Sequence, residues 1–167
     1  METIQNKQKN KTKVVVTLRK GVQMGESILN GIVGDYLRGT SNGLSIDMQF
    51  FRHGQPVVLD TDFPEKYDTP LNPKICILVH GLLNNETTWN YKGSDEVNYG
   101  SLLHKDLNYT PFYVRYNTGA HISENGKLLS QLISSLLTVY PVQVEEIVMI
   151  AHSMGGLVVR SACHYAP

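Results

Sequence analysis

Apolar side chains recur at helical spacing in two segments of the chain, residues 21–37 and residues 128–137. In both segments they follow the pattern i, i+1, i+4 and i+5, which is one face of an amphipathic helix. We therefore predict a helix in each, the first ended by Gly39 and the second by Tyr140 and Pro141. The two stripes are Ile28, Leu29, Ile32, Val33, Tyr36 and Leu37, and Leu128, Leu129, Leu132, Ile133, Leu136 and Leu137.

Three short runs are almost continuously apolar: residues 74–80 (KICILVH), 112–116 (FYVRY) and 145–151 (EEIVMIA). A short continuous apolar run is typical of a strand that is buried on both faces of a parallel sheet. We expect further helices at residues 99–105 and 155–165. Strands that alternate with helices in this way predict βαβ units with right-handed crossovers.

Before these runs, apolar and polar positions alternate in residues 44–51. A turn at His53 and Gly54 and a second strand-like segment, residues 56–59, follow, so we predict an antiparallel hairpin. Residues 60–73 form a turn-rich connector in this interpretation. The expected fold class is α/β: a mostly parallel sheet with helices on both faces and an N-terminal antiparallel hairpin.

Composition narrows the functional classes only slightly. Lys and Arg total 15, as do Asp and Glu, so no net field would attract nucleic acid. We expect residues 1–20 to be a disordered basic tail and residues 21–167 to belong to one domain. The tail lacks the apolar segment of a secretory signal and no run is long enough to span a membrane, which favours a cytoplasmic location and leaves membrane association open. Cys76 and Cys163 are expected to be free thiols, and no spacing indicates a metal or a cofactor.

The strongest chemical signal is the segment HSMGG, which follows the apolar strand 145–151. It predicts a sharp strand-to-helix turn that exposes Ser153 as a nucleophile, with Gly155 relieving crowding around it. We expect Gly156 to let the following helix pack close to the sheet. The N–H of Met154 would lie at the N-terminus of that helix, where the helix dipole favours a developing negative charge.

A second motif follows the strand 74–80. His80, Gly81 and Leu82 would lie beside the serine turn if the two strands are neighbours. We predict that the N–H of Leu82 is the second donor of an oxyanion hole and that Gly81 lets the backbone turn toward the substrate. His80 is expected to hydrogen-bond the loop and to have a structural role, not that of a general base.

Together, the two motifs resemble those of the α/β-hydrolase superfamily, in its lipase and esterase branch, including GPI inositol-deacylase-like and bacterial lipase-like members. The similarity spans residues 74–165 and includes the segments YGSLLHKDL, FYVRYNTG and HISENGKLL, with Ala151 in the first position of G-x-S-x-G. It implies hydrolysis of a small ester or lipid substrate through an acyl-enzyme on Ser153, without a cofactor.

The same resemblance implies that an acid and a histidine follow the nucleophile. Residues 154–167 contain no Asp or Glu, and His164 would lie about three turns along the helix from Ser153. We therefore expect a partial α/β-hydrolase fold, truncated after the nucleophile elbow and without its C-terminal strands. Such a chain would be inactive unless a complementing C-terminal segment supplied the base.

Other assignments stay open at this stage. None of His53, His104, His121 and His152 has a spacing that identifies it as the base. Trp89 either lines an acyl pocket or anchors its loop, and Arg115 and Arg160 either bind an anion or form ordinary ion pairs. A non-enzymatic remnant or interaction module and an acyltransferase remain the alternatives to a hydrolase.

Overall fold

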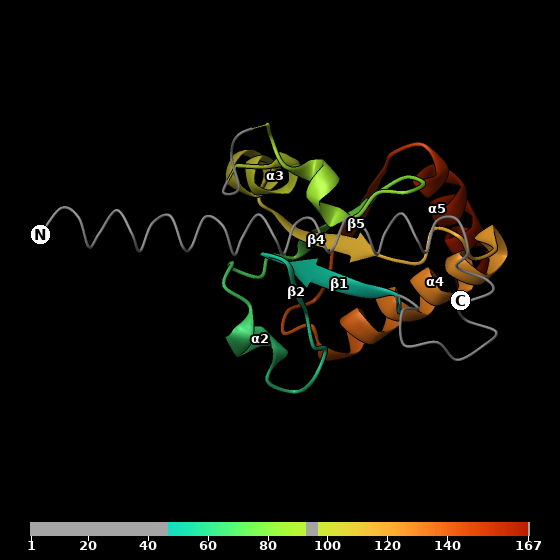
Figure 1. Cartoon of the computed structure of the whole chain (residues 1–167). Helices are drawn as coiled ribbons and strands as arrows, with labels where there is room; N and C mark the ends of the chain where they lie inside the picture. The colour runs from blue at the N-terminus through green and yellow to red at the C-terminus, as the bar shows by residue number, and fades with distance from the viewer. Residues whose placement is uncertain (1–46, 93–96, 167) are drawn as a thin grey trace, which may run out of the picture.

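A five-stranded mixed sheet organises the part of the chain that the computed structural model describes, residues 47–92 and 97–166 (Figure 1). The strand order is β2-β1-β4-β3-β5. The predicted tail, residues 1–20, and the first helical stripe lie outside the described residues. The strands are β1 (Gln49–Arg52), β2 (Gln55–Pro56), β3 (Lys74–Val79), β4 (Tyr109–Arg115) and β5 (Glu146–Ala151).

The pairing of the strands corrects one prediction. β3 pairs in parallel with β4 and β5, but β1 pairs antiparallel with both β2 and β4, so the described sheet is mixed and not mostly parallel. The hairpin turns at His53 and Gly54, both with positive φ (48° and 73°), as a two-residue turn of the primed type requires. β4 begins at Tyr109, earlier than predicted, and contains Pro111, whose ring interrupted the sequence signal for a strand.

Helices cover both faces of the sheet. Side chains alternate along β3, so that Ile75, Ile77 and Val79 pack into one apolar cluster and Cys76 and Leu78 into another. α4 and α5 contribute to the first cluster, whereas α3 and the short 3-10 helix η1 contribute to the second. The helices are α2 (Phe63–Lys66), η1 (Glu86–Trp89), α3 (Tyr99–Leu107), α4 (Ile122–Val139) and α5 (Met154–Tyr165).

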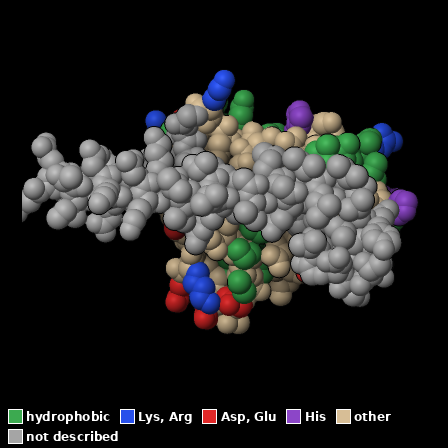
Figure 2. Space-filling view, in the orientation of Figure 1, with side chains coloured by type: hydrophobic (Ala, Val, Ile, Leu, Met, Phe, Trp, Pro, Cys, Tyr) green, Lys and Arg blue, Asp and Glu red, His purple; other side chains and the backbone are tan. Residues whose placement is uncertain are grey.

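Local chemistry sets the ends of these helices. The side chain of Asn98 accepts a hydrogen bond from the N–H of Ser101 at 2.8 Å, and the Ser101 hydroxyl accepts one from the N–H of Asn98 at 3.0 Å, which is a capping box at the start of α3. α3 ends at Asn108 in the left-handed conformation, with φ 60°. The predicted connector 60–73 contains α2, and charged side chains of both signs lie around α2 (Figure 2).

α4 and α5 approach each other most closely at a glycine. A Cβ atom added to Gly126 of α4 would lie 2.4 Å from the Cβ of Ser161 in α5 and 2.9 Å from its carbonyl carbon. Because backbone as well as side chain stands in the way, a larger residue would force the two helices apart.

Two glycines in helices should therefore respond in opposite ways to substitution by alanine. Gly126→Ala should lower the free energy of unfolding by about 1–3 kcal/mol, because overpacking outweighs the gain in helix propensity. Gly156→Ala, with open space at its Cβ position, should raise it by up to about 1 kcal/mol. Urea denaturation of the two variants measures both changes, and a stabilised Gly126→Ala would contradict the proposed contact.

Candidate active site

Ser153 lies in the turn between β5 and α5 and has a backbone conformation that L-residues rarely adopt. Its φ is 53° and its ψ is −124°, and its side chain is exposed. The N–H of His152 donates to the carbonyl of Val79 at 3.0 Å, and the N–H of Gly155 donates to the carbonyl of His152 at 3.0 Å. The turn is thus fixed on both sides of a strained residue, and such strain costs on the order of 1–3 kcal/mol.

Gly155 allows α5 to begin directly against the end of β3. A Cβ atom at Gly155 would lie 2.5 Å from the carbonyl oxygen of Val79 and 2.6 Å from that of His80. No side chain fits there. Gly156, by contrast, has nothing within 4 Å of its Cβ position, so the close packing that we expected of Gly156 belongs to Gly155.

The loop that follows β3 touches the serine turn. A Cβ atom at Gly81 would lie 3.1 Å from the Cβ of Ser153 and 3.1 Å from the carbonyl oxygen of His152. Leu82 follows Gly81 directly, and Met154 is the first residue of α5. Within the described part of the chain, neither the N–H of Leu82 nor that of Met154 donates a hydrogen bond. Two backbone donors are therefore free at the end of the sheet where Ser153 is exposed.

This loop is short and held by its own polar contacts. Leu83 has a positive φ of 59°, and its N–H donates to the hydroxyl of Thr118 at 3.2 Å. The N–H of Asn84 donates to the carbonyl of Gly81 at 3.3 Å. The side chain of Asn85 accepts from the N–H of Thr87 and caps η1. The loop therefore leads without slack from β3 into η1.

His80 is completely buried under this loop. Its ring stacks on Tyr116, with centroids 4.5 Å apart, and its Nδ1 lies 3.0 Å from the carbonyl oxygen of Gly81. Burial lowers the pKa of His80 to about 4, so the ring is neutral at neutral pH. Its Nε2 has no hydrogen-bond partner among the described residues. These contacts give His80 a place in the structure of the loop and none on the exposed side of Ser153.

No histidine of the described residues hydrogen-bonds Ser153, whose side chain has no partner in this part of the chain. His53 contacts Asp68, and Nδ1 of His104 lies 3.0 Å from the carbonyl oxygen of Tyr109. His164, in the last turn of α5, packs against the ring of Tyr165. His121 precedes the first residue of α4, and His152 is exposed beside the turn. The described residues thus supply a nucleophile and two donors but no bound base.

Two residues near the loop were undecided in the sequence, and one was missed. Trp89 is buried in the cluster of α3 and β3, which supports a role in anchoring the loop. Arg115, at the end of β4, forms a buried bidentate ion pair with Glu86 of η1. Nothing in the sequence pattern singled out Glu86, because its partner lies 29 residues away. Arg160 is exposed on α5.

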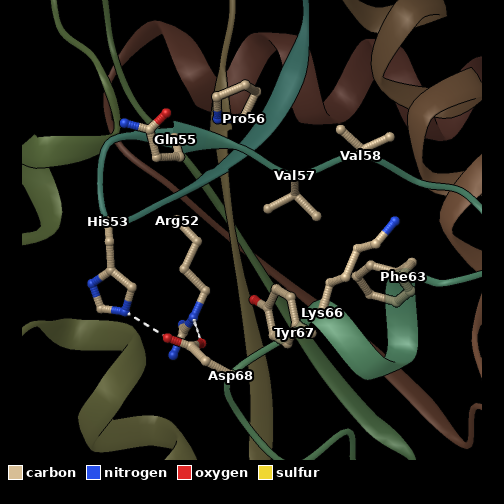
Figure 3. A pocket seen from close by; sticks show the side chains of 10 residues that line it. All are labelled: Arg52, His53, Gln55, Pro56, Val57, Val58, Phe63, Lys66, Tyr67 and Asp68. Atoms are coloured by element: carbon tan, nitrogen blue, oxygen red, sulfur yellow. Dashed lines mark hydrogen bonds and ion pairs between the residues drawn. The ribbon is translucent and has the colours of Figure 1, made fainter.

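A separate hollow of about 350 Å³ lies between the β1–β2 hairpin and α2 (Figure 3). It is lined by Val57, Phe63 and Tyr67, with Arg52 and Asp68 joined by an ion pair at its rim. Because β1 runs antiparallel to β4, this hollow is at the N-terminal ends of the parallel strands, opposite Ser153. It is not part of the serine site.

Two further searches bear on the site. The described residues contain no group of three or more His, Cys, Asp and Glu side chains placed to hold a metal ion. Residues 47–92 and 97–166 include no helix with the length and apolar character needed to cross a bilayer.

The strain at Ser153 predicts an unusual effect of glycine. Ser153→Gly should be more stable than Ser153→Ala by about 1 kcal/mol, because glycine adopts this φ without a steric penalty that exceeds its entropic cost. The same pair at the exposed Ser135 in the middle of α4 should show the reverse order, by about 1 kcal/mol. Denaturant unfolding gives all four values, and the same order at both positions would exclude strain at Ser153.

Burial of neutral His80 predicts a loss of stability in acid. Between the ordinary value of 6.5 and the folded pKa of about 4, the unfolded chain binds a proton that the folded chain does not. The free energy of unfolding should therefore fall as the pH falls through this window, by up to about 3 kcal/mol. His80→Phe should lose this part of the pH dependence in urea unfolding at pH 4–7. An unchanged slope would show that His80 titrates equally in both states.

The comparisons with known proteins agree with this arrangement of residues. No curated protein and no solved structure matches the chain significantly. A family described as "Putative serine esterase (DUF676)" matches residues 70–167, a segment that contains β3, the loop after it, Ser153 and α5. The chain belongs to this serine esterase family.

Proposed function

We propose that this protein has the α/β-hydrolase fold and hydrolyses carboxylic esters of the lipase or esterase type through an acyl-enzyme on Ser153. The observation that carries the proposal is the backbone of Ser153, an exposed serine with φ 53° between a parallel strand and a helix. A strained non-glycine residue at this position is the geometry of a nucleophile elbow. Membership of a serine esterase family supports the same chemistry.

In the proposed reaction, the Ser153 hydroxyl attacks the ester carbonyl and its proton passes to a base. The N–H groups of Leu82 and Met154 would donate to the resulting oxyanion, because both lack an acceptor in the described part of the chain. The N-terminus of α5 would add the favourable field of the helix dipole. Collapse of the tetrahedral intermediate expels the alcohol, which takes the proton, and water then hydrolyses the acyl-enzyme in a second cycle.

The base is the component that the described residues do not supply, and we place it on a complementing segment. β5 pairs only with β3 in the described part of the chain, so its outer edge is open. All residues of β5 after Glu146 are partly exposed, whereas those of β3 after Lys74 are buried. A strand added at this edge would cover both and would end beside Ser153, at the carboxyl ends of the parallel strands.

Exposed apolar side chains around Ser153 favour an ester with an apolar acyl group. Leu82 is 48% exposed, Leu83 is 36% exposed, and Leu157, four residues after Ser153 on α5, is 54% exposed. Positions four apart on a helix share one face, so Leu157 lies next to the start of α5. A small ester or a lipid would cover these side chains, and the absence of a charged residue among them disfavours an anionic acyl group.

A fluorophosphonate probe tests the nucleophile and its missing base together. The chain should be labelled slowly by itself, and the product of the adjacent downstream reading frame should raise the labelling rate roughly 10²–10⁴-fold, the usual contribution of a general base. Ser153→Ala should abolish labelling under both conditions, and Ser135→Ala, which removes an exposed serine of α4, should leave it unchanged.

Two outcomes would contradict the proposal. Labelling that survives Ser153→Ala would identify another nucleophile. Failure to label with any added segment, in a protein that is folded by circular dichroism, would favour an interaction module that keeps the fold of an esterase without its activity.

A further inference from the structure

The loop between β3 and α3 is tied to the sheet by a buried ion pair. Nε of Arg115 donates to Oε2 of Glu86 at 2.6 Å, and Nη2 donates to Oε1. The side chains of Arg115 and Glu86 are only 8% and 7% exposed. The guanidinium carbon lies 3.7 Å from the ring centroid of Phe51, so an aromatic face covers the cation. Both charges are paired in two hydrogen bonds and withdrawn from water.

The position of the pair relates it to the serine turn. Arg115 is the last residue of β4, and the preceding Val114 is in register with Val79, after which the loop begins. Glu86 is the first residue of η1, four residues after Leu82. The ion pair therefore fixes the far end of the 82–86 segment, and its near end is fixed where Gly81 contacts Ser153.

Stability alone does not account for such a pair. Removing two charges from water costs several kcal/mol per ion, and replacing a buried pair by apolar residues of similar volume is often neutral or stabilising. An apolar contact, however, does not define an orientation, whereas a bidentate guanidinium–carboxylate pair fixes both distance and direction. The pair is suited to holding a loop in one register.

We propose that Glu86 and Arg115 are positioning residues, which hold the loop 81–90 so that the N–H of Leu82 points to the oxyanion formed at Ser153. This inference rests on the proposed function. The pair touches neither the nucleophile nor the donor, and it acts through the backbone of residues 82–86. Thr118, whose hydroxyl accepts from the N–H of Leu83, supports the same segment from the other side.

The test replaces the pair as a unit. Glu86→Met with Arg115→Met removes both charges and keeps similar volume, so that no unpaired charge remains buried. The matched control is Arg52→Met with Asp68→Asn, which removes the ion pair at the opposite end of the sheet. Glu86→Gln alone, nearly isosteric, serves as a second variant if the double variant does not fold.

Two readouts separate positioning from general stability. Hydrogen exchange measured by mass spectrometry should rise at least about tenfold in peptides of residues 81–90 and stay unchanged in α4. Under the condition that labels the wild type, the maximal rate of fluorophosphonate labelling, kinact, should fall by roughly 10²–10³-fold, as when one oxyanion donor is lost, with KI changed by less than about threefold. The control pair should change neither.

Unchanged exchange in residues 81–90, or an equal change in the control, would overturn the inference. Loss of probe affinity with kinact retained would also overturn it, because that pattern indicates altered binding. If the wild type is not labelled under any condition, the proposed function fails, and the exchange measurement alone then decides whether the pair positions the loop.

Discussion

The close approach of α5 to the end of β3 is the constraint on which the rest of the site depends. Only a glycine fits at position 155, because the carbonyl oxygens of Val79 and His80 occupy the space of a side chain. With the helix held so near the sheet, the chain must reverse within two residues after β5. Ser153 takes up this reversal by adopting a positive φ. The strain, the exposure of the hydroxyl and the position of the helix N-terminus thus have a single cause.

Parallel pairing then brings the remaining parts to the same edge. Val79 is in register with Val114 on one side and with Ala151 on the other, so the residues that follow these strands emerge together. His80, Arg115 and His152 consequently lie at one end of the sheet, although they are distant in sequence. The central position and complete burial of β3 give this edge a rigid support. The loop after β3 lies on it, and η1 closes the second apolar cluster.

The sequence predicted what depends on neighbouring residues. Periodicity placed β3, β5, α4 and α5, and the segment HSMGG identified Ser153, since a nucleophile elbow has a local signature. It could not distinguish Gly155 from Gly156, because both are adjacent and only the position of Val79 decides which one is crowded. It missed Glu86 for a similar reason. The antiparallel share of the sheet was also underestimated, because the alternation before residue 52 does not say which strand it joins.

The unfavourable features of the molecule are concentrated at one end of the sheet. The strained backbone of Ser153, the buried Nε2 of His80 and the buried Glu86–Arg115 pair each cost free energy, and all three adjoin the loop after β3. At the opposite end, the ion pair of Lys66 with Asp60 is exposed and carries little penalty. Strain distributed at random would not follow this division. Its concentration around one exposed serine argues that the conformation of this edge is maintained for chemistry and not for stability.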